Sequence, residues 1–202
     1  GGTERARSIN EALAVAAEEH QWAIALGSGR AAIENESRAK SYQIRRLAPS
    51  VPIIANIGAV QLNYGIGADE CARLVEMFEA DALVLHFNSL QELFQDKGDT
   101  NFKGLLQKIE RLCSSLNVPV GAKEVGWGIS GLAAEKLLNA GVQFIDVAGA
   151  GGTSWSQVEK LRSHHLMRQR AAEAFANWGI PTAECITDIR SRNKYCTLIA
   201  SG

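Results

Sequence analysis

The chain has 202 residues, 46% of them apolar, and a formal net charge of −1 with a pI near 6.5. This length and composition suffice to bury the core of one domain over residues 1–202, and the near-neutral charge offers no broad basic field for nucleic acid or an anionic membrane. Because no apolar run approaches the roughly 18 residues that span a bilayer and no signal-like stretch occurs, we expect a cytoplasmic protein without membrane insertion.

Six short apolar runs are typical of β-strands, and longer stretches with an apolar residue every three to four positions separate them. The predicted strands are 22–27, 51–57, 81–86, 118–124, 143–148 and 196–201. The predicted helical stripes consist of Ile9, Leu13, Ala16 and Ala17, of Leu74, Val75 and Phe78, of Leu105, Ile109 and Leu112, and of Leu132, Leu137 and Leu138. Because several strands are almost continuously apolar, we expect parallel strands buried on both faces under helices.

The connection from Ala150 to about Tyr195 is the longest and contains His164 and His165. It predicts either a mobile segment that covers a ligand or a solvated helical face, and the sequence leaves both alternatives open.

Repeated strand–helix units fit either an open doubly wound sheet or a closed (β/α)₈ barrel. Polar residues or glycines stand at the end of nearly every predicted strand, namely Ser28 and Arg30, Asn56, His86 and Asn88, Lys123 and Glu124, Gly149–Gly152, and Ser201 and Gly202. This distribution favours the barrel, because a doubly wound sheet concentrates its site at one switch point. A barrel of about 250 residues uses roughly 31 per unit. We therefore expect this chain to cover about strands 2 to 7, with Gly1 and Gly2 in the loop after a missing first strand.

The four cysteines form no CxxC pair and no Cys/His cluster with metal-ligand spacing. We expect all four to be reduced and packed as small apolar residues, namely Cys71, Cys113, Cys185 and Cys196.

The most specific motif is the run HFNSLQE at 86–92, followed by Gln95 and by Gly98 and Asp99. It places an imidazole, two amides and one carboxylate within seven residues at a strand end. Such a set suits a polar head group and one hard cation, since Mg²⁺ commonly takes only one or two protein carboxylates. The alternative is a structural His86 and a Glu92 that caps a helix, which the clustering disfavours.

Three further strand ends carry candidate ligands. Lys123 closes an apolar strand and could stabilise an anionic reduced flavin, or could instead pair with Glu124. The glycine-rich turn 148–155 ends in two hydroxyl residues and could admit an anion or a cofactor, although it is neither GxGxxG nor a P-loop. Arg30 could clamp a diphosphate or lie on the surface, and Asn56 could meet a flavin edge or be a structural amide.

In this order, a Gly-Gly-Thr start, GSxR, ANIGA, HxNxxQE with QxxxGD, KEVGxGIS, DVAGAGGTSW, NWGIPT and IASG resemble the type 2 isopentenyl-diphosphate isomerases over the whole chain. The resemblance implies an FMN- and Mg²⁺-dependent enzyme that interconverts isopentenyl diphosphate and dimethylallyl diphosphate. It also implies NAD(P)H as the reductant of the flavin and a homo-oligomer, either a tetramer or an octamer. Reduced FMN would then act as the acid and the base while the protein orients it.

The resemblance also assigns residues. FMN would contact Gly2, Thr3, Ser28, Asn56, Lys123 and Thr153. The isoprenoid diphosphate would contact Ser28, Gly29, Arg30, His86, Asn88 and Gln91, with His86, Asn88 and Gln91 as catalytic candidates and Glu92 as the Mg²⁺ ligand. Gly29 and Phe87 depart from the pattern, in which a larger residue and Leu are usual. The family's N-terminal diphosphate-binding segment and its loop for the FMN phosphate fall outside this sequence.

Two alternatives remain. An FMN-dependent 2-hydroxy acid oxidase or dehydrogenase would share the barrel but needs a catalytic His with a nearby Arg after a late strand, whereas His164 and His165 lie well past the strand. A flavin-sensing or scaffold protein without catalysis is disfavoured by the complete set His86, Asn88, Gln91 and Glu92.

Overall fold

The computed structural model describes residues 2–202, so the expectation for Gly1 lies outside the described residues. Its sheet contains β1 (Ile24–Ala25), β2 (Ile53–Gly58), β3 (Ala82–His86), β4 (Val120–Lys123), β5 (Phe144–Asp146) and β6 (Thr197–Ile199). The helices are α1 (Glu4–His20), α2 (Arg30–Glu34), α3 (Ala68–Phe78), α4 (Ser89–Phe94), α5 (Leu105–Ser115), α6 (Gly131–Asn139), α7 (Trp155–Arg162), α8 (Leu166–Ala174) and α9 (Thr182–Arg192), with 3₁₀ turns η1 (Glu36–Ser41) and η2 (Ala59–Asn63). Each of the six predicted strands is confirmed, in every case shorter than the apolar run that predicted it.

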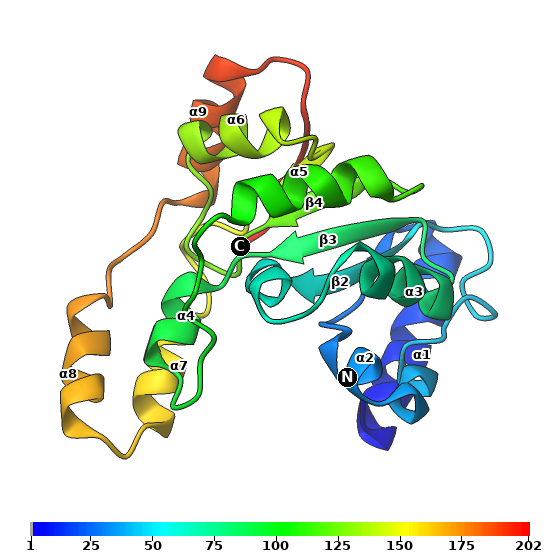
Figure 1. Ribbon diagram of the computed structural model, residues 1–202, viewed down its shortest axis with the longest axis horizontal. Coiled ribbons are helices and arrows are strands. Elements are labelled where there is room, and N and C mark those ends of the chain that lie inside the picture. Colours follow the sequence, from blue (N-terminus) through cyan, green and yellow to red (C-terminus); the bar gives the residue numbers. More distant parts are fainter. Residues whose placement is uncertain (1) are drawn as a thin grey trace.

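The strands lie in the order β1-β2-β3-β4-β5-β6, and every neighbouring pair is parallel. The sheet curls, and its carboxyl ends point toward α4 and α7 (Figure 1). Because the strand order never reverses, the described sheet has no switch point of the doubly wound kind. The α/β class with sequential parallel strands is therefore confirmed, whereas closure into eight strands and the assignment to strands 2 to 7 stay predictions.

The two faces of the sheet differ in burial. Ile53, Leu83 and Ile145 point to the helix-covered face and are completely buried. On the opposite, concave face Val84 is 2% exposed, whereas the end positions Lys123 and Asp146 are half-buried. The expected burial on both faces therefore holds at Val84, but it fails at the carboxyl ends of the strands, where the concave face carries polar groups.

Two of the predicted apolar helix stripes are only partly correct. On α1, Ile9 and Leu13 are 52% and 53% exposed, and the helix instead packs through Ala14 and Ala17. On α6, Leu132 is 51% exposed, although Leu137 is buried as expected. The small alanines on the packing faces of these helices allow close approach to the neighbouring elements. The bulkier apolar residues therefore lie at the edges of these faces. The stripes of α3 and α5 are confirmed, with the partial exception of the half-buried Val75.

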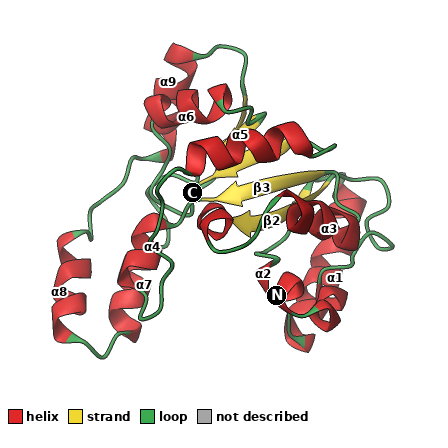
Figure 2. Ribbon diagram, in the orientation of Figure 1, coloured by secondary structure: helices red, strands yellow, loops and turns green. Residues whose placement is uncertain are grey.

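The connection from 150 to 195 is helical. It forms a hairpin of α7 and α8 at one side of the molecule, followed by α9, as Figure 2 shows. Helix α7 packs against α4, and α9 packs against α6. His164 and His165 lie exposed in the turn between α7 and α8. The connection is therefore helical, although α7 buries Ser156 and Glu159 and is not a wholly solvated face. Its expected role in covering a ligand stays a prediction.

Two further expectations concern membranes and cysteines. Within residues 2–202, every helix is too short or too polar to cross a membrane. All four cysteines are free, and Cys71 and Cys185 are fully buried. Burial raises the pKa of the Cys71 thiol to about 12, which leaves it protonated at neutral pH.

Candidate active site

Four polar side chains line the concave face at the carboxyl ends of neighbouring strands. His86, Lys123 and Asp146 are register partners across β3, β4 and β5. Asn56 lies two residues before Gly58, the partner of His86, so its side chain is on the same face. We call Asn56, His86, Lys123 and Asp146 the concave row. The fold therefore brings together three residues that the sequence analysis selected and adds Asp146, which accepts a hydrogen bond from the Ser201 hydroxyl at 2.5 Å.

His86 is held as a neutral imidazole. Its Nδ1 lies 2.7 Å from Asn56 Oδ1, and since an amide oxygen only accepts, Nδ1 carries the proton and Nε2 is left as an acceptor. A Cβ atom at Gly58 would lie 3.2 Å from Nε2, so the glycine leaves room for the ring. Burial, and secondarily the Lys123 charge, lower the pKa of His86 from 6.5 to about 4.

This shift predicts an acid-sensitive stability. The unfolded chain binds a proton at His86 below about pH 6.5, and the folded chain only below about pH 4. The contribution of neutral His86 to the free energy of unfolding is therefore complete above about pH 6.5. It is lost as the pH falls toward 4, and the free energy of unfolding decreases by about 3 kcal/mol in total. Urea unfolding at several pH values should show this slope, and the variant His86→Gln should lack it. Equal slopes for the two proteins would contradict the assignment.

The side chains of Lys123 and Glu124 turn away from each other. Lys123 Nζ donates to the Glu124 carbonyl oxygen at 2.5 Å, and Glu124 Oε2 accepts from the backbone N–H groups of Val125, Gly126 and Trp127 at 2.7, 3.1 and 2.8 Å. The Lys123–Glu124 ion pair does not form, and Lys123 pairs with no carboxylate of residues 2–202. The concave row thus carries a cation available to an anionic group.

A second group of residues surrounds α4 and is called the α4 network here: Asn88, Gln91, Glu92, Asp99 and Glu159. Asn88 Nδ2 donates to Glu92 Oε1 at 2.7 Å and to Gln91 Oε1 at 3.3 Å. The other Glu92 oxygen accepts from Asp99 N–H at 2.8 Å. Asn88, Gln91, Glu92 and Asp99 therefore form one hydrogen-bonded unit, whereas His86 of the same motif belongs to the concave row. Their expected role in binding a head group and a cation stays a prediction.

Arg30 joins the network through Asp99. Its Nη1 lies 2.8 Å from Asp99 Oδ2, which also accepts from Gln61 Nε2 at 2.9 Å. Arg30 is half-exposed and pairs with Glu34 as well. The fold thus brings the GSxR segment next to the HxNxxQE segment. Gln61 is buried and was missed, because a single glutamine in the run after a strand gives no distinctive pattern.

The network fits a hard cation in one respect. Asn88 Oδ1 is a buried oxygen without a hydrogen-bond partner, and it belongs to the amide that contacts Glu92. An unpartnered buried acceptor beside a carboxylate is the kind of oxygen pair that Mg²⁺ uses. Among residues 2–202, no three His, Cys, Asp or Glu side chains gather as a metal site. A cation bound by Glu92 would therefore need further oxygen ligands, for which Asn88 Oδ1 is the candidate beside it.

Glu159 of α7 is the most informative residue that sequence reasoning missed. It is buried, and its Oε1 accepts from Gln91 Nε2 at 3.3 Å and from Gln95 Nε2 at 3.4 Å, with Arg162 Nη1 at 3.6 Å. The contact orients the Gln91 amide so that its oxygen faces Asn88. The available signal was the helical spacing of Ser156, Glu159 and Ser163 in the sequence, and the structure buries all three.

Of the remaining predicted residues, Gly29 contacts the concave row, because its N–H donates to the Asn56 carbonyl oxygen at 2.7 Å. Ser28 is half-buried and its carbonyl accepts from the Tyr42 hydroxyl, while a side chain at Gly29 would meet Leu74 in the core at 2.5 Å. Gly29 can therefore contact a ligand only through its backbone. Gly2 N–H donates to the Ser41 hydroxyl, and the Thr3 hydroxyl caps α1.

The glycine-rich turn fits a close approach to a bound molecule. A Cβ at Gly149 would lie 2.4 Å from Thr182 N, whereas Gly151, at φ +142°, has open space around it. Thr153 is exposed beside this turn. An open backbone edge near Thr153, together with the cation and the amide of the concave row, is a donor set that suits a flavin.

Comparison with known proteins gives consistent names. The chain is 56% identical over all 202 residues to the isopentenyl-diphosphate delta-isomerases of Oceanobacillus iheyensis and of a Nostoc species, and 48% identical to that of Rickettsia prowazekii. It spans 58%, 58% and 59% of these relatives. No protein-family model matches the chain. A crystal structure of a phosphonopyruvate hydrolase with oxalate and Mg²⁺ aligns with 96% of this chain and 73% of its own at 17% identity and a TM-score of 0.49.

Proposed function

We propose that this chain carries the active site of an isopentenyl-diphosphate delta-isomerase of the FMN-dependent type. The observation that carries the proposal is the 48–56% identity, over the whole chain, to proteins with that enzyme name. The reaction interconverts isopentenyl and dimethylallyl diphosphate by adding one proton and removing another, without net oxidation. The exposed position of His164 and His165, away from the concave row, disfavours the 2-hydroxy acid oxidase alternative.

In this proposal, the α4 network and Arg30 hold the diphosphate. Glu92 would bind Mg²⁺, whose remaining positions would be filled by water and diphosphate oxygens. Arg30 is already turned toward the network by Asp99, and its guanidinium can offer two parallel donors to phosphate oxygens. Glu159 would fix the Gln91 amide against the substrate. These groups bind and orient; none of them is a strong acid or base.

The concave row would face the flavin. Bound FMN, reduced by NAD(P)H, would supply the acid and the base of the reaction. Lys123 would place a positive charge near the anionic part of the reduced ring, and Asn56 would present its amide beside it. His86, neutral and fixed by Asn56, would offer an uncharged wall to the apolar part of the substrate.

Lys123→Met is therefore expected to weaken binding of reduced FMN about tenfold, because the charge is lost in a partly desolvated site. An anaerobic titration followed by flavin absorbance would measure the change. Lys103→Met, at an exposed position on the loop before α5, is the matched control and should leave binding unchanged. If the two variants bind reduced FMN with equal affinity, Lys123 does not belong to the flavin site.

The function itself is tested by turnover. The chain is incubated anaerobically with FMN, NADPH, Mg²⁺ and isopentenyl diphosphate, and dimethylallyl diphosphate is quantified. A parallel assay with glycolate and lactate measures oxygen uptake. We expect isomerisation and no oxidation of the hydroxy acids. Oxidation would replace the proposal by the oxidase alternative, and a flavin-binding chain without either activity would favour a sensing or scaffold role.

A further inference from the structure

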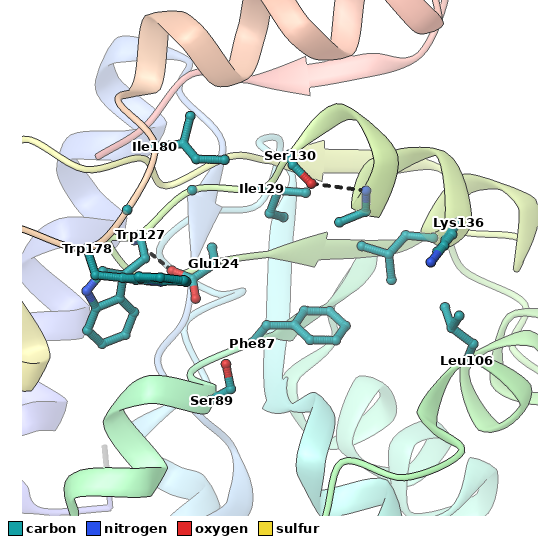
Figure 3. Close-up of a pocket in the computed structure, with 14 residues that line it drawn as sticks. Phe87, Ser89, Leu106, Glu124, Trp127, Ile129, Ser130, Lys136, Trp178 and Ile180 are labelled. Carbon is teal, nitrogen blue, oxygen red and sulfur yellow. Dashed lines mark hydrogen bonds between the residues drawn. The ribbon is translucent and has the colours of Figure 1, made fainter. Parts of the chain in front are cut away.

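A cavity of about 650 Å³ lies outside the candidate active site, between α5, α6 and the segment that leads into α9. Its walls are mostly apolar, and the side chains that line it include Phe87, Leu106, Trp127, Trp178 and Ile180 (Figure 3). The volume is ample for a small organic molecule. None of the residues in the concave row or the α4 network lines this cavity.

The cavity shares one stretch of chain with the candidate active site. Phe87 and Ser89 line the cavity, whereas their neighbours His86 and Asn88 belong to the concave row and the α4 network. The opposite side is closed by residues 178–180, which are tied to Trp127 by a backbone hydrogen bond from Ile180 N–H at 2.8 Å. A Cβ at Gly179 would lie 3.2 Å from the Trp127 backbone, so glycine permits this crossing.

One charged group lines the cavity on its buried side. Glu124 is only 8% exposed, and Oε2 receives all three backbone N–H groups that the carboxylate contacts. Oε1 has no hydrogen-bond partner within residues 2–202. Burial raises the pKa of this carboxyl, against the opposing effect of the N–H groups and Lys123. The open oxygen of this mostly buried carboxylate can accept from a cationic donor that enters the cavity.

The side chains around Glu124 indicate the chemistry of the rest of the ligand. Figure 3 shows the carboxyl beside Trp127 and facing the same space as Phe87, while Lys136 stands at the far end of the cavity. Aromatic faces attract an ammonium group and pack against an apolar body. Lys136 is exposed on α6, so its charge is screened by solvent.

We propose that this cavity is a second binding site, for a small primary amine with an apolar body, whose ammonium group pairs with Glu124 Oε1 among the aromatic side chains. The proposal rests on the cavity and Glu124 and is independent of the isomerase activity.

Three probes of similar shape test the charge requirement: 4-phenylbutylamine, the neutral 4-phenylbutan-1-ol and the anionic 5-phenylpentanoate. Titrations at pH 7.5 are followed by NMR through the indole N–H signals of the four tryptophans. We expect the amine to bind at least tenfold more tightly than the alcohol and to shift Trp127 and Trp178, while Trp22 and Trp155, which do not line the cavity, stay unchanged. Equal affinities, tightest binding of the anion, or no binding of the amine would overturn the proposal.

Two variants locate the site. Glu124→Gln keeps the size of the side chain and should reduce amine affinity to that of the alcohol, without changing alcohol affinity. Ala133→Phe fills the cavity from α6 and should abolish binding of both probes, whereas Leu132→Phe, on the exposed face of the same helix, should not. If Glu124→Gln fails to fold, the comparison of Ala133→Phe with Leu132→Phe still tests whether the amine binds in this cavity. Amine binding that survives Ala133→Phe would place the ligand elsewhere and refute the assignment.

Discussion

Glu92→Gln is expected to raise the Mg²⁺ concentration needed for half-maximal isomerase activity about 100-fold while leaving the chain folded. Glu92 contacts both Asn88 and the Asp99 backbone, and the glutamine has the same shape but lacks the charge that would bind Mg²⁺. Changes to groups that merely support a metal ligand already cost about 10- to 100-fold, so loss of the ligand's charge should reach the upper end. Initial rates over a Mg²⁺ titration would measure the shift.

Glu34→Gln provides the matched control for this variant. Glu34 pairs with Arg30 at 2.7 Å, as Asp99 does, but makes no contact with Asn88 or Asp99. Its Mg²⁺ requirement should stay within about twofold of the parent chain. If both variants behave alike, the effect belongs to Arg30 rather than to a metal ligand, and an unchanged requirement in Glu92→Gln would exclude Glu92 as the Mg²⁺ site.

Phe78→Ala is expected to destabilise the chain by about 3–5 kcal/mol, which is a large part of the total stability of a domain of this size. Phe78 is completely buried and stacks on Tyr42, with ring centroids 4.5 Å apart. Truncation removes apolar burial and leaves a cavity between α3 and the segment around Tyr42. The midpoint of urea unfolding should therefore fall sharply.

Leu161→Ala is the control for packing. Leu161 is 83% exposed on α7, so its truncation should change the free energy of unfolding by less than about 0.5 kcal/mol. A Phe78→Ala variant as stable as Leu161→Ala would mean that the core collapses around the lost ring.

The strands could be predicted because their signal is local. In β3, for example, the run Ala-Leu-Val-Leu is bounded by Asp81 and His86, and this run alone predicts the strand. The polar ends also predicted which residues meet, since parallel strands deliver their carboxyl ends to one edge. Asn56 and His86, thirty residues apart, are in hydrogen-bond contact for this reason.

What could not be predicted depends on distant packing. The burial of Ala14 rather than Leu13 on α1 is decided by which neighbours the helix meets, not by its own periodicity. Glu159 reaches Gln91 only because α7 folds back onto α4 across 68 residues of sequence. Asp146 could have been predicted as a site residue, because a carboxylate within the apolar run QFIDVA is a local anomaly.

The alternation of side chains along 86–89 has a practical consequence for protein engineering. A library that varies Phe87 or Ser89 to alter the cavity changes residues directly adjacent to His86 and Asn88, so selection for a new ligand would also act on the concave row and the α4 network. Leu106 and Ala133 line the same cavity from α5 and α6, whose residues take no part in the concave row or the α4 network. Those two positions are the sensible starting points for directed evolution of a ligand-responsive variant.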